Sequence, residues 1–273
     1  MKPQSTSPPL RGASDRLFAA AFLGVVGVFT LFVVLLIASD AALVDRAALA
    51  TIFTAPFVRH ALWMSIWTSV TSTCIAVLFA VPMGYALSRL RFPGRMLIDA
   101  LVDLPIVFPP LVAGLTLLVF FAQSPVGRFI EDDLGLEFIF QPAGIVLCQF
   151  FVAASLAIRT TKTAFDDVDP RCEHVALTLG CTRAGAFLRV ALPLAAHGII
   201  AGALLTWARA FGLFGPLIVF VGSFRGRTEV LSSTIFLEQS VGNLETALAL
   251  ALLLIAVALA TLFAMRLVTA RRW

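Results

Sequence analysis

Long uncharged runs of apolar residues alternate with short charged segments along this 273-residue chain. An α-helix needs about 20 consecutive apolar residues to cross the hydrocarbon core of a bilayer. The runs long enough to do so predict spans over about residues 17–39, 61–88, 104–124, 140–158, 193–222 and 246–266. Runs that are so continuously apolar exclude the alternating strands of a membrane β-barrel. We therefore predict an all-α, polytopic membrane protein with six transmembrane helices.

The composition agrees with a membrane protein. Hydrophobic residues make up 60% of the chain and charged residues only 13%, whereas a soluble domain has about 25% charged residues. The net charge of +4 could suggest nucleic acid, but basic residues also mark topology in membranes. We expect the lipid bilayer to surround the protein, and no nucleic-acid partner. The first apolar run exceeds the core of a cleaved signal peptide, about 7–15 residues, so we expect it to be retained.

Basic residues are unevenly distributed between the two sides that six spans define. Fourteen lie on one side and five on the other, with Arg209 inside a span. The richer side holds the tails 1–16 and 269–273, the loop that follows the second span, and the loop 159–192. The positive-inside rule places this side in the cytoplasm. The prediction is one transmembrane domain over residues 17–268 with both termini cytoplasmic.

The loop 159–192 contains a short segment with helical features. Asp169 and Pro170 suit a helix start, because Asp caps free N–H groups and Pro fits the first helical position. Gly180 is a natural stop, since glycine readily takes the left-handed conformation after a helix. Between them the sequence predicts a helix of about ten residues. A second helical piece over residues 184–190 leads into the fifth span.

The predicted loop helix is too short to span the membrane and too polar to lie in lipid. Val175, Ala176 and Leu179 are spaced so that they fall on one face. A helix held between two spans is able to sit in a partner's groove and transmit motion to the membrane helices. The alternative is an ordinary surface helix tucked under the bundle.

The same loop resembles a cytoplasmic motif of bacterial ABC importer permeases. In that motif Glu-Ala-Ala is separated by three residues from Gly, and nine more residues precede Ile-x-Leu-Pro. Here the Glu-Ala-Ala positions hold His174, Val175 and Ala176, and the terminal tetrapeptide begins with Val190. Glu173 lies one residue before the expected glutamate, so the polar contact with the ATPase is left open. The resemblance implies a coupling site made of Glu173, His174, Val175, Ala176, Leu179, Gly180, Val190, Leu192 and Pro193.

Two further segments resemble the molybdate, tungstate and sulfate permease group. Residues 101–114, LVDLPIVFPPLVAG, look like the proline-rich third span of that group. Residues 207–216, WARAFGLFGP, are similar to its fifth-span motif, which often reads Ala-Arg-x-x-Gly-Glu-Phe-Gly. Leu213 takes the glutamate position of that motif. Only the N-terminal span and the outer loops lack a motif of this kind, so the resemblance extends over about two-thirds of the chain.

The resemblance implies a type I importer-like permease fold in a bacterial inner membrane. It implies two permease copies as a homodimer, two cytoplasmic ABC ATPase subunits, and an extracytoplasmic solute-binding protein. The chain has no Gly-Lys-Ser/Thr phosphate loop, so we expect no cofactor on this chain and no enzyme activity, with ATP and Mg bound by the partner ATPase. The implied solute is an oxyanion such as molybdate, tungstate or sulfate. Ferric iron, thiamine or a polyamine is the alternative.

Several residues inside the spans are candidates for the translocation path. Arg209 would cost at least about 2.5–3.5 kcal/mol if it faced lipid, so we expect it to face the bundle interior or a wet cavity. There its guanidinium would suit an oxyanion, or it would form a structural ion pair, for example with Asp103. Glycine and proline allow helices to break where protein surrounds them, or simply kink them for packing. The candidates of this kind are Gly212, Gly215, Pro105, Pro109 and Pro110.

Two other classes of function remain as alternatives. A secondary transporter would need ion-coupling carboxylates in its spans, and only Asp99 and Asp103 come close. An intramembrane enzyme would need a nucleophile pair or a metal trio near one of the three histidines, and the sequence places none there. Cysteine and histidine share the loop 159–192, but their spacing matches no paired-cysteine zinc pattern, so we expect no metal site.

Overall fold

A computed structural model describes residues 13–270, and these residues form helices joined by short loops, without any strand among them. The first half contains α1 (Ala13–Leu43), α2 (Arg46–Thr54), α3 (Pro56–Arg89), α4 (Arg95–Val107), α5 (Pro110–Gln123), α6 (Pro125–Arg128) and the π-helical turn η1 (Phe129–Asp133). The second half contains α7 (Pro142–Asp166), α8 (Pro170–Thr178), α9 (Arg183–Ala186), the π-helical turn η2 (Phe187–Ala191), α10 (Leu192–Phe211), α11 (Gly215–Phe220), α12 (Leu231–Ser240) and α13 (Leu244–Ala270).

The first and last helices extend into the segments that the sequence predicted as tails. α1 starts within the tail predicted over residues 1–16, and α13 ends within the tail predicted over 269–273. The remaining tail residues, 1–12 and 271–273, lie outside the described part of the chain.

Five helices in the described part of the chain are long and apolar enough to cross a membrane. They are Arg16–Leu43, Pro56–Arg89, Pro142–Asp166, Arg183–Phe211 and Leu244–Phe263. A sixth span results if α4 and α5 are counted together, although their axes are bent by 112° at the break between them. The run predicted as the third span, residues 104–124, is therefore divided between two helices. Proline explains the break, because Pro109 and Pro110 cannot donate the hydrogen bonds that would continue α4.

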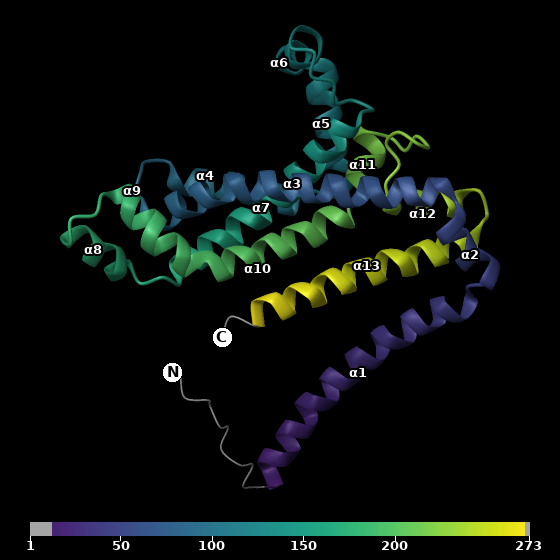
Figure 1. Ribbon diagram of the computed structural model, residues 1–273, viewed down its shortest axis with the longest axis horizontal. Coiled ribbons are helices and arrows are strands. Elements are labelled where there is room, and N and C mark those ends of the chain that lie inside the picture. The colour runs from purple at the N-terminus through teal and green to yellow at the C-terminus, as the bar shows by residue number, and fades with distance from the viewer. Residues whose placement is uncertain (1–12, 271–273) are drawn as a thin grey trace.

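The centre of the bundle is α7, which packs most extensively against α3 and α10 (Figure 1). Small residues allow the close approach of these helices. A Cβ atom on Gly198 would lie 2.5 Å from the Ala164 Cβ, and one on Gly202 would lie 2.2 Å from the Thr160 hydroxyl oxygen. The pair of glycines thus sets the distance between α10 and α7, as small residues commonly do between membrane helices.

The hydroxyl-rich part of α3 faces the bundle interior. Five of its serine and threonine side chains are buried, namely Ser65, Thr68, Ser69, Ser72 and Thr73. Most of their hydroxyls donate to backbone carbonyls one turn earlier, as Thr68 does to Met64 at 2.8 Å. Such bonds satisfy the hydroxyl in an apolar environment. Helix packing explains these residues.

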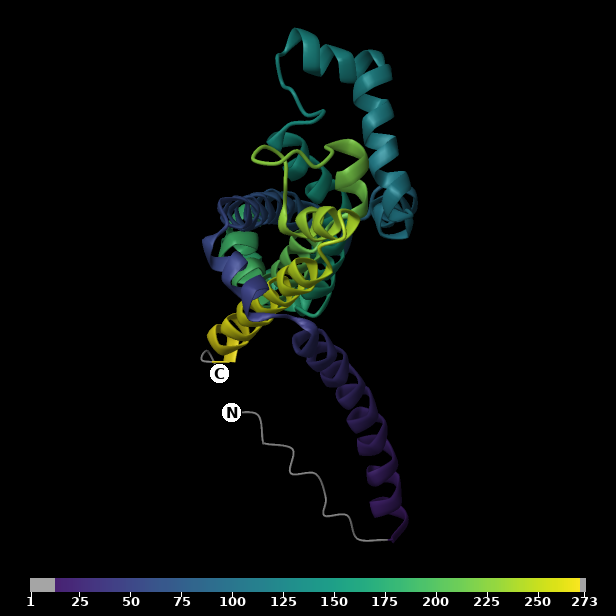
Figure 2. The same ribbon diagram turned by 90° about the vertical axis from the view of Figure 1, so that its right-hand side faces the viewer.

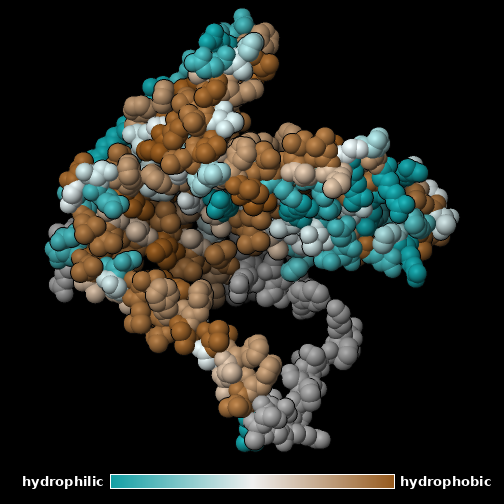
Figure 3. Space-filling model, turned by 180° about the vertical axis from the view of Figure 1, so that it is seen from behind, coloured by the Kyte–Doolittle hydropathy of each residue, from teal (hydrophilic) through white to brown (hydrophobic). Residues whose placement is uncertain are grey.

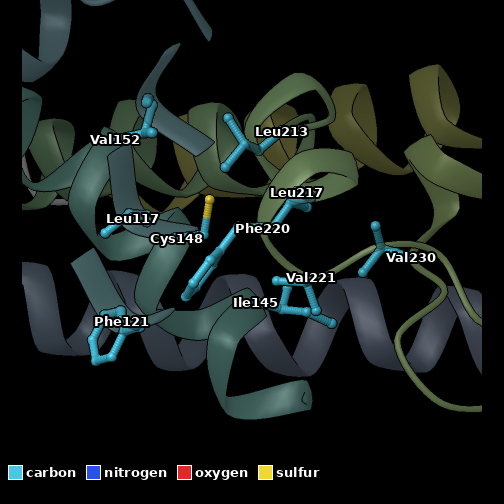
Figure 4. Close-up of a cluster of buried hydrophobic side chains, with 11 residues drawn as sticks. Leu117, Phe121, Ile145, Cys148, Val152, Leu213, Leu217, Phe220, Val221 and Val230 are labelled. Atoms are coloured by element: carbon cyan, nitrogen blue, oxygen red, sulfur yellow. The ribbon is translucent and has the colours of Figure 1, made fainter. Parts of the chain in front are cut away.

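The helices α5 and α11 pack on each other and project from the main bundle (Figure 2). Their core is an apolar cluster to which α5, α7 and α11 contribute, with Leu213 and Val230 from the adjoining loops (Figure 4). Phe121 and Phe220 lie in this cluster with ring centroids 5.8 Å apart. Packing of this kind fixes α11 after the chain has broken at the end of α10.

The first helix stands apart from the rest. α1 contacts α13 and diverges from the bundle toward its N-terminal end (Figures 1 and 2). None of the residues in its apolar window is buried within the described chain. Its apolar surface, including Phe29 and Phe32, is therefore free for lipid or for another protein.

Polar residues gather at the end of the bundle that carries α8 and α9, while the sides of the long helices are largely apolar (Figure 3). Large exposed hydrophobic side chains continue along these sides, among them Trp63, Leu78 and Leu205. A soluble monomer rarely exposes such wide apolar areas. The distribution is that of a multi-pass membrane protein with α8 outside the hydrocarbon region.

Candidate functional site

The loop helix α8 is delimited by the two signals that the sequence carries. The Asp169 carboxylate accepts a hydrogen bond from the Arg171 N–H at 2.9 Å, and Pro170 is the first helical residue. At the other end Gly180 has a φ of +89°. The Gly180 N–H donates to the Leu177 carbonyl and the Cys181 N–H to the Ala176 carbonyl, which together form a Schellman cap. The predicted start and stop are confirmed.

The two faces of α8 differ in a way that the sequence did not predict. Ala176 is buried and faces the bundle, whereas Val175 is 57% exposed and Leu179 is 80% exposed. The prediction that all three residues share one face is wrong for Ala176. Val175 and Leu179 are four residues apart, so they lie one above the other on the outward face. The helix thus presents an apolar pair to its surroundings at the polar end of the molecule.

Glu173 fixes the inward face of α8 to the end of α3. One carboxylate oxygen accepts a hydrogen bond from the Arg89 Nε at 2.8 Å, and the other accepts one from the Tyr85 hydroxyl at 2.7 Å. The second guanidinium nitrogen of Arg89 donates to the Val168 carbonyl at 2.6 Å, just before α8. Glu173 is 7% exposed, so this is a largely buried, charge-assisted contact.

These contacts show which partners Glu173, the acidic residue next to the motif's glutamate position, binds in this fold. His174, which occupies the glutamate position of the motif, is exposed. Glu173 instead points inward and binds α3. Arg89 and Tyr85 are functional candidates that the sequence alone did not indicate, because each lies more than eighty residues before its partner.

The remaining residues of the predicted coupling site lead from α8 into the fifth span. Val190 lies in η2, while Leu192 and Pro193 begin α10. α8 packs against η2, and Ala191 in that turn is fully buried. A displacement of α8 would therefore be transmitted to α3 through Glu173 and to α10 through η2.

The two segments predicted to break inside the membrane pack on each other. A Cβ atom on Gly215 would lie 3.1 Å from the Pro110 Cβ, and one on Gly114 would lie 2.4 Å from the Pro216 carbonyl oxygen. Gly212 terminates α10 and Pro109 precedes α5. Pro105, by contrast, lies inside α4. The chain therefore has two adjacent helix breaks, where backbone groups are freed from helical pairing.

Arg209 lies in the last turn of α10, next to one of these breaks. Its side chain is exposed in the single chain. The ion pair with Asp103 does not form, because Asp103 pairs with Arg159. Asp99 also contacts Arg159, at 3.3 Å, and Lys162, at 3.6 Å. The two carboxylates that a secondary transporter would need are thus engaged in joining α4 to α7.

Leu213, at the glutamate position of the fifth-span motif, is 6% exposed and belongs to the apolar cluster of Figure 4. Its carbonyl accepts a hydrogen bond from the Ser232 hydroxyl at 2.7 Å. The position is structural here: the side chain fills the core, and the backbone holds the start of α12.

A bundle of long apolar helices with a short, anchored helix at one polar end is the architecture expected of a membrane permease subunit. The chain belongs to the family of binding-protein-dependent transport system inner membrane components, which matches residues 72–273. It is 37% identical over 247 residues to a probable molybdenum ABC transporter permease protein of Haloferax volcanii, covering 90% of this chain and 89% of that protein. It is 35% identical over 206 residues to the molybdenum transport system permease protein ModB of Escherichia coli K12, covering 73% and 90%.

Solved structures show the same fold. The chain aligns with a bacterial ABC transporter involved in the import of the acidic polysaccharide alginate with a TM-score of 0.71 at 18% identity, over 94% of this chain and 96% of that one. It aligns with an amino acid ABC transporter with a TM-score of 0.60 at 18% identity, over 82% and 97%. The predicted all-α, type I importer-like permease fold is confirmed.

Proposed function

We propose that this chain forms the solute pathway of an ATP-driven importer and couples to a separate ATPase through α8. The observation that carries this proposal is the two-sided character of α8. Its outward face presents Val175 and Leu179, and its inward face is joined to α3 by the buried Glu173. An apolar pair on an otherwise polar end is typical of a helix that docks in a groove. The inward contacts are what such a helix needs to move the spans.

The partners follow from this role. ATP and Mg would be bound by cytoplasmic ABC ATPase subunits, and an extracytoplasmic solute-binding protein would deliver the solute. The side that carries α8 would be cytoplasmic, as the positive-inside rule requires. A second copy of the chain is supported by α1, whose apolar window is wholly unburied in the single chain. A homodimer would cover part of that surface.

The solute class that we propose is a tetrahedral oxyanion such as molybdate, tungstate or sulfate. The names of the relatives support it: a probable molybdenum permease, ModB, a molybdate/tungstate permease of Thermococcus kodakarensis and a sulfate permease of Salmonella typhimurium. Arg209 supports it from this chain itself. Its guanidinium is unpaired within the described residues and lies beside the helix break at Gly212, where a cation would lower the barrier for an anion.

Docking is tested by replacing both outward residues of α8. In V175D/L179D the ATPase should no longer copurify with the permease, because two carboxylates would be desolvated in the groove. The matched control is L134D/L136D, since Leu134 and Leu136 are similarly exposed but lie in the loop after η1. Equal recovery of ATPase with both double variants would refute the proposal that α8 docks.

The solute is tested by uptake of radioactive molybdate. Arg209→Ala should reduce the initial rate about tenfold or more, which corresponds to the loss of one charge-assisted contact. ATPase assembly should remain intact, and Arg209→Lys should retain part of the rate. Unchanged uptake in R209A would make the residue architectural. Competition by ferric iron, thiamine or a polyamine instead of tungstate would reassign the solute class.

A further inference from the structure

A cavity of about 750 Å³ lies between α8, the end of α3 and the start of α9. Small-molecule sites typically have volumes of about 300–1,000 Å³. Residues from three separate segments line it: Arg89, Arg91 and Arg95 around the α3–α4 connection, Glu173 and His174 from α8, and Arg183 from α9. The four arginines and single glutamate give the lining a formal charge of +3.

Two of the four arginines donate hydrogen bonds to groups within the protein. Arg89 binds Glu173 and the Val168 carbonyl. Arg95 donates to the carbonyls of Leu87 and Leu90 and so caps the C-terminal end of α3. These contacts rigidify the wall of the cavity.

The other two arginines, Arg91 and Arg183, have no hydrogen bond or ion pair among the described residues, and both are exposed. They come from two separate segments of the lining, since Arg91 follows α3 and Arg183 begins α9. His174 adds a further nitrogen on the α8 side. Unpaired guanidinium groups that converge on one cavity are the arrangement that binds phosphate-like oxyanions, because the planar fork donates two parallel hydrogen bonds.

We propose that this cavity is a binding site for a phosphate-like tetrahedral oxyanion, held between Arg91 and Arg183. The site is separate from the outward face of α8 and from Arg209. An anion there would join the α3–α4 connection to the loop that carries α8, and so would restrain the joint whose movement the proposed function requires. Binding itself does not rest on that function.

The oxyanion has two sources with the same chemistry. The lining residues lie at the end of α3, in α8 and at the start of α9, the end of the bundle where polar residues gather (Figure 3). A pocket at that end would meet the phosphate groups of the lipid. Basic pockets at this level bind anionic head groups. A free inorganic anion would fill only part of the cavity, and a head group would fill more of it.

The test uses the full chain in nanodiscs of zwitterionic phosphatidylcholine and radioactive inorganic phosphate in equilibrium dialysis. Wild type should bind phosphate, and R91Q/R183Q should bind it about tenfold or more weakly, since two charge-assisted contacts are lost. R171Q/R189Q is the matched control, because Arg171 and Arg189 are exposed on the same loop but do not line the cavity. It should bind as wild type does.

A second set of nanodiscs contains phosphatidylglycerol. If the lipid is the source of the phosphate group, it should displace inorganic phosphate from wild type, and native mass spectrometry should show lipid retained by the control and lost by R91Q/R183Q. If the free anion is the source, phosphate binding should persist. R91K/R183K keeps the positive charges but lacks the planar guanidinium groups, so it should give intermediate binding. This result would also show that the loss of binding in the glutamine variant is not caused by misfolding.

The site is overturned if wild type binds neither probe, or if the two glutamine double variants lose binding equally. ATPase coupling is measured separately on the assembled complex. Absence of anion binding by wild type together with normal coupling refutes only this inference. Anion binding by a chain that never assembles with an ATPase refutes only the proposed function.

Discussion

Glu173 shows how one side chain can join the loop helix to the membrane domain. It accepts hydrogen bonds from Arg89 and Tyr85, and the side chains of the Arg89–Glu173 pair are only 13% and 9% exposed. Removing one member of such a pair leaves a buried charge without a partner. Glu173→Ala should therefore lower the free energy of unfolding by about 3 kcal/mol.

Unfolding in mixed micelles with increasing sodium dodecyl sulfate measures this loss. Glu173→Gln should lose less, because the amide oxygen still accepts a hydrogen bond from Tyr85. Glu137→Ala is the control: its carboxylate is exposed, and its removal should change stability by less than about 0.5 kcal/mol. Equal losses in E173A and E137A would show that the buried contact contributes nothing.

Glu229, in the loop between α11 and α12, should make stability depend on pH. It is fully buried, and burial raises the pKa of its carboxyl, an effect that Thr234 and Arg225 offset only in part. Because the folded pKa lies above the ordinary value of about 4.3, the protonated form is favoured in the folded state. Stability is greatest below the ordinary pKa and falls as the pH rises through the raised one.

Glu229→Gln removes this titration, so its unfolding midpoint should stay flat over the interval in which that of wild type falls. Thermal unfolding at a series of pH values measures both curves. The neighbouring Arg225–Glu238 pair is retained in this variant. Parallel curves for the two proteins would contradict the assignment.

At the scale of whole elements, the crossing of α7 and α10 depends on the absence of side chains at two positions. A Cβ on Gly198 would meet the rigid Ala164 methyl at 2.5 Å, so the helices would have to separate. Gly198→Ala should cost about 1–3 kcal/mol, as overpacking usually does. Gly24→Ala is the control, because nothing lies within 4 Å of that position on α1. The same detergent titration should show a loss for G198A alone.

α8 also shows how far the sequence predicts an element. Asp169, Pro170 and Gly180 define its ends through local backbone chemistry, and the structure places those ends as expected. Its orientation was not predictable, since a rotation of one residue decides whether Ala176 or Val175 faces the bundle. That rotation is set by Glu173 binding α3, a contact between residues far apart in sequence.

The two helix breaks near Pro110 and Gly215 were likewise only partly predictable from the sequence. Proline and glycine predict that a helix ends, but not the 112° bend between α4 and α5. They also do not predict that the two breaks meet, with Gly215 against Pro110 and Gly114 against Pro216. The direction after each break depends on the apolar cluster shared by α5, α7 and α11. That cluster combines residues from apolar runs that are far apart in the sequence. Because these runs are similarly apolar, the sequence does not indicate which of them pack together.

For the molecule as a whole, the distribution of polar residues separates the two ends of the bundle. The end with α8 and α9 is rich in arginine, and the loop between α11 and α12 lies at the opposite end, near α2 (Figures 1 and 3). The excess of basic residues predicts that the α8 end is cytoplasmic. The orientation also decides which face meets the ATPase and which meets the solute-binding protein.

Cysteine labelling tests this orientation directly. Cys172, on α8, is exposed, whereas Cys148 is buried in α7. A membrane-impermeant maleimide should therefore label Cys172 in inverted membrane vesicles and leave it unlabelled in intact cells. C172S should abolish most of that signal, and the remainder should come from the partly exposed Cys181. Cys74 is also exposed, but it lies in the middle of the apolar helix α3, where a membrane-impermeant reagent should not reach it. A cysteine introduced at Arg227, in the loop before α12, should show the opposite pattern. Labelling of Cys172 in intact cells would reverse the topology and place the loop helix out of reach of any cytoplasmic ATPase.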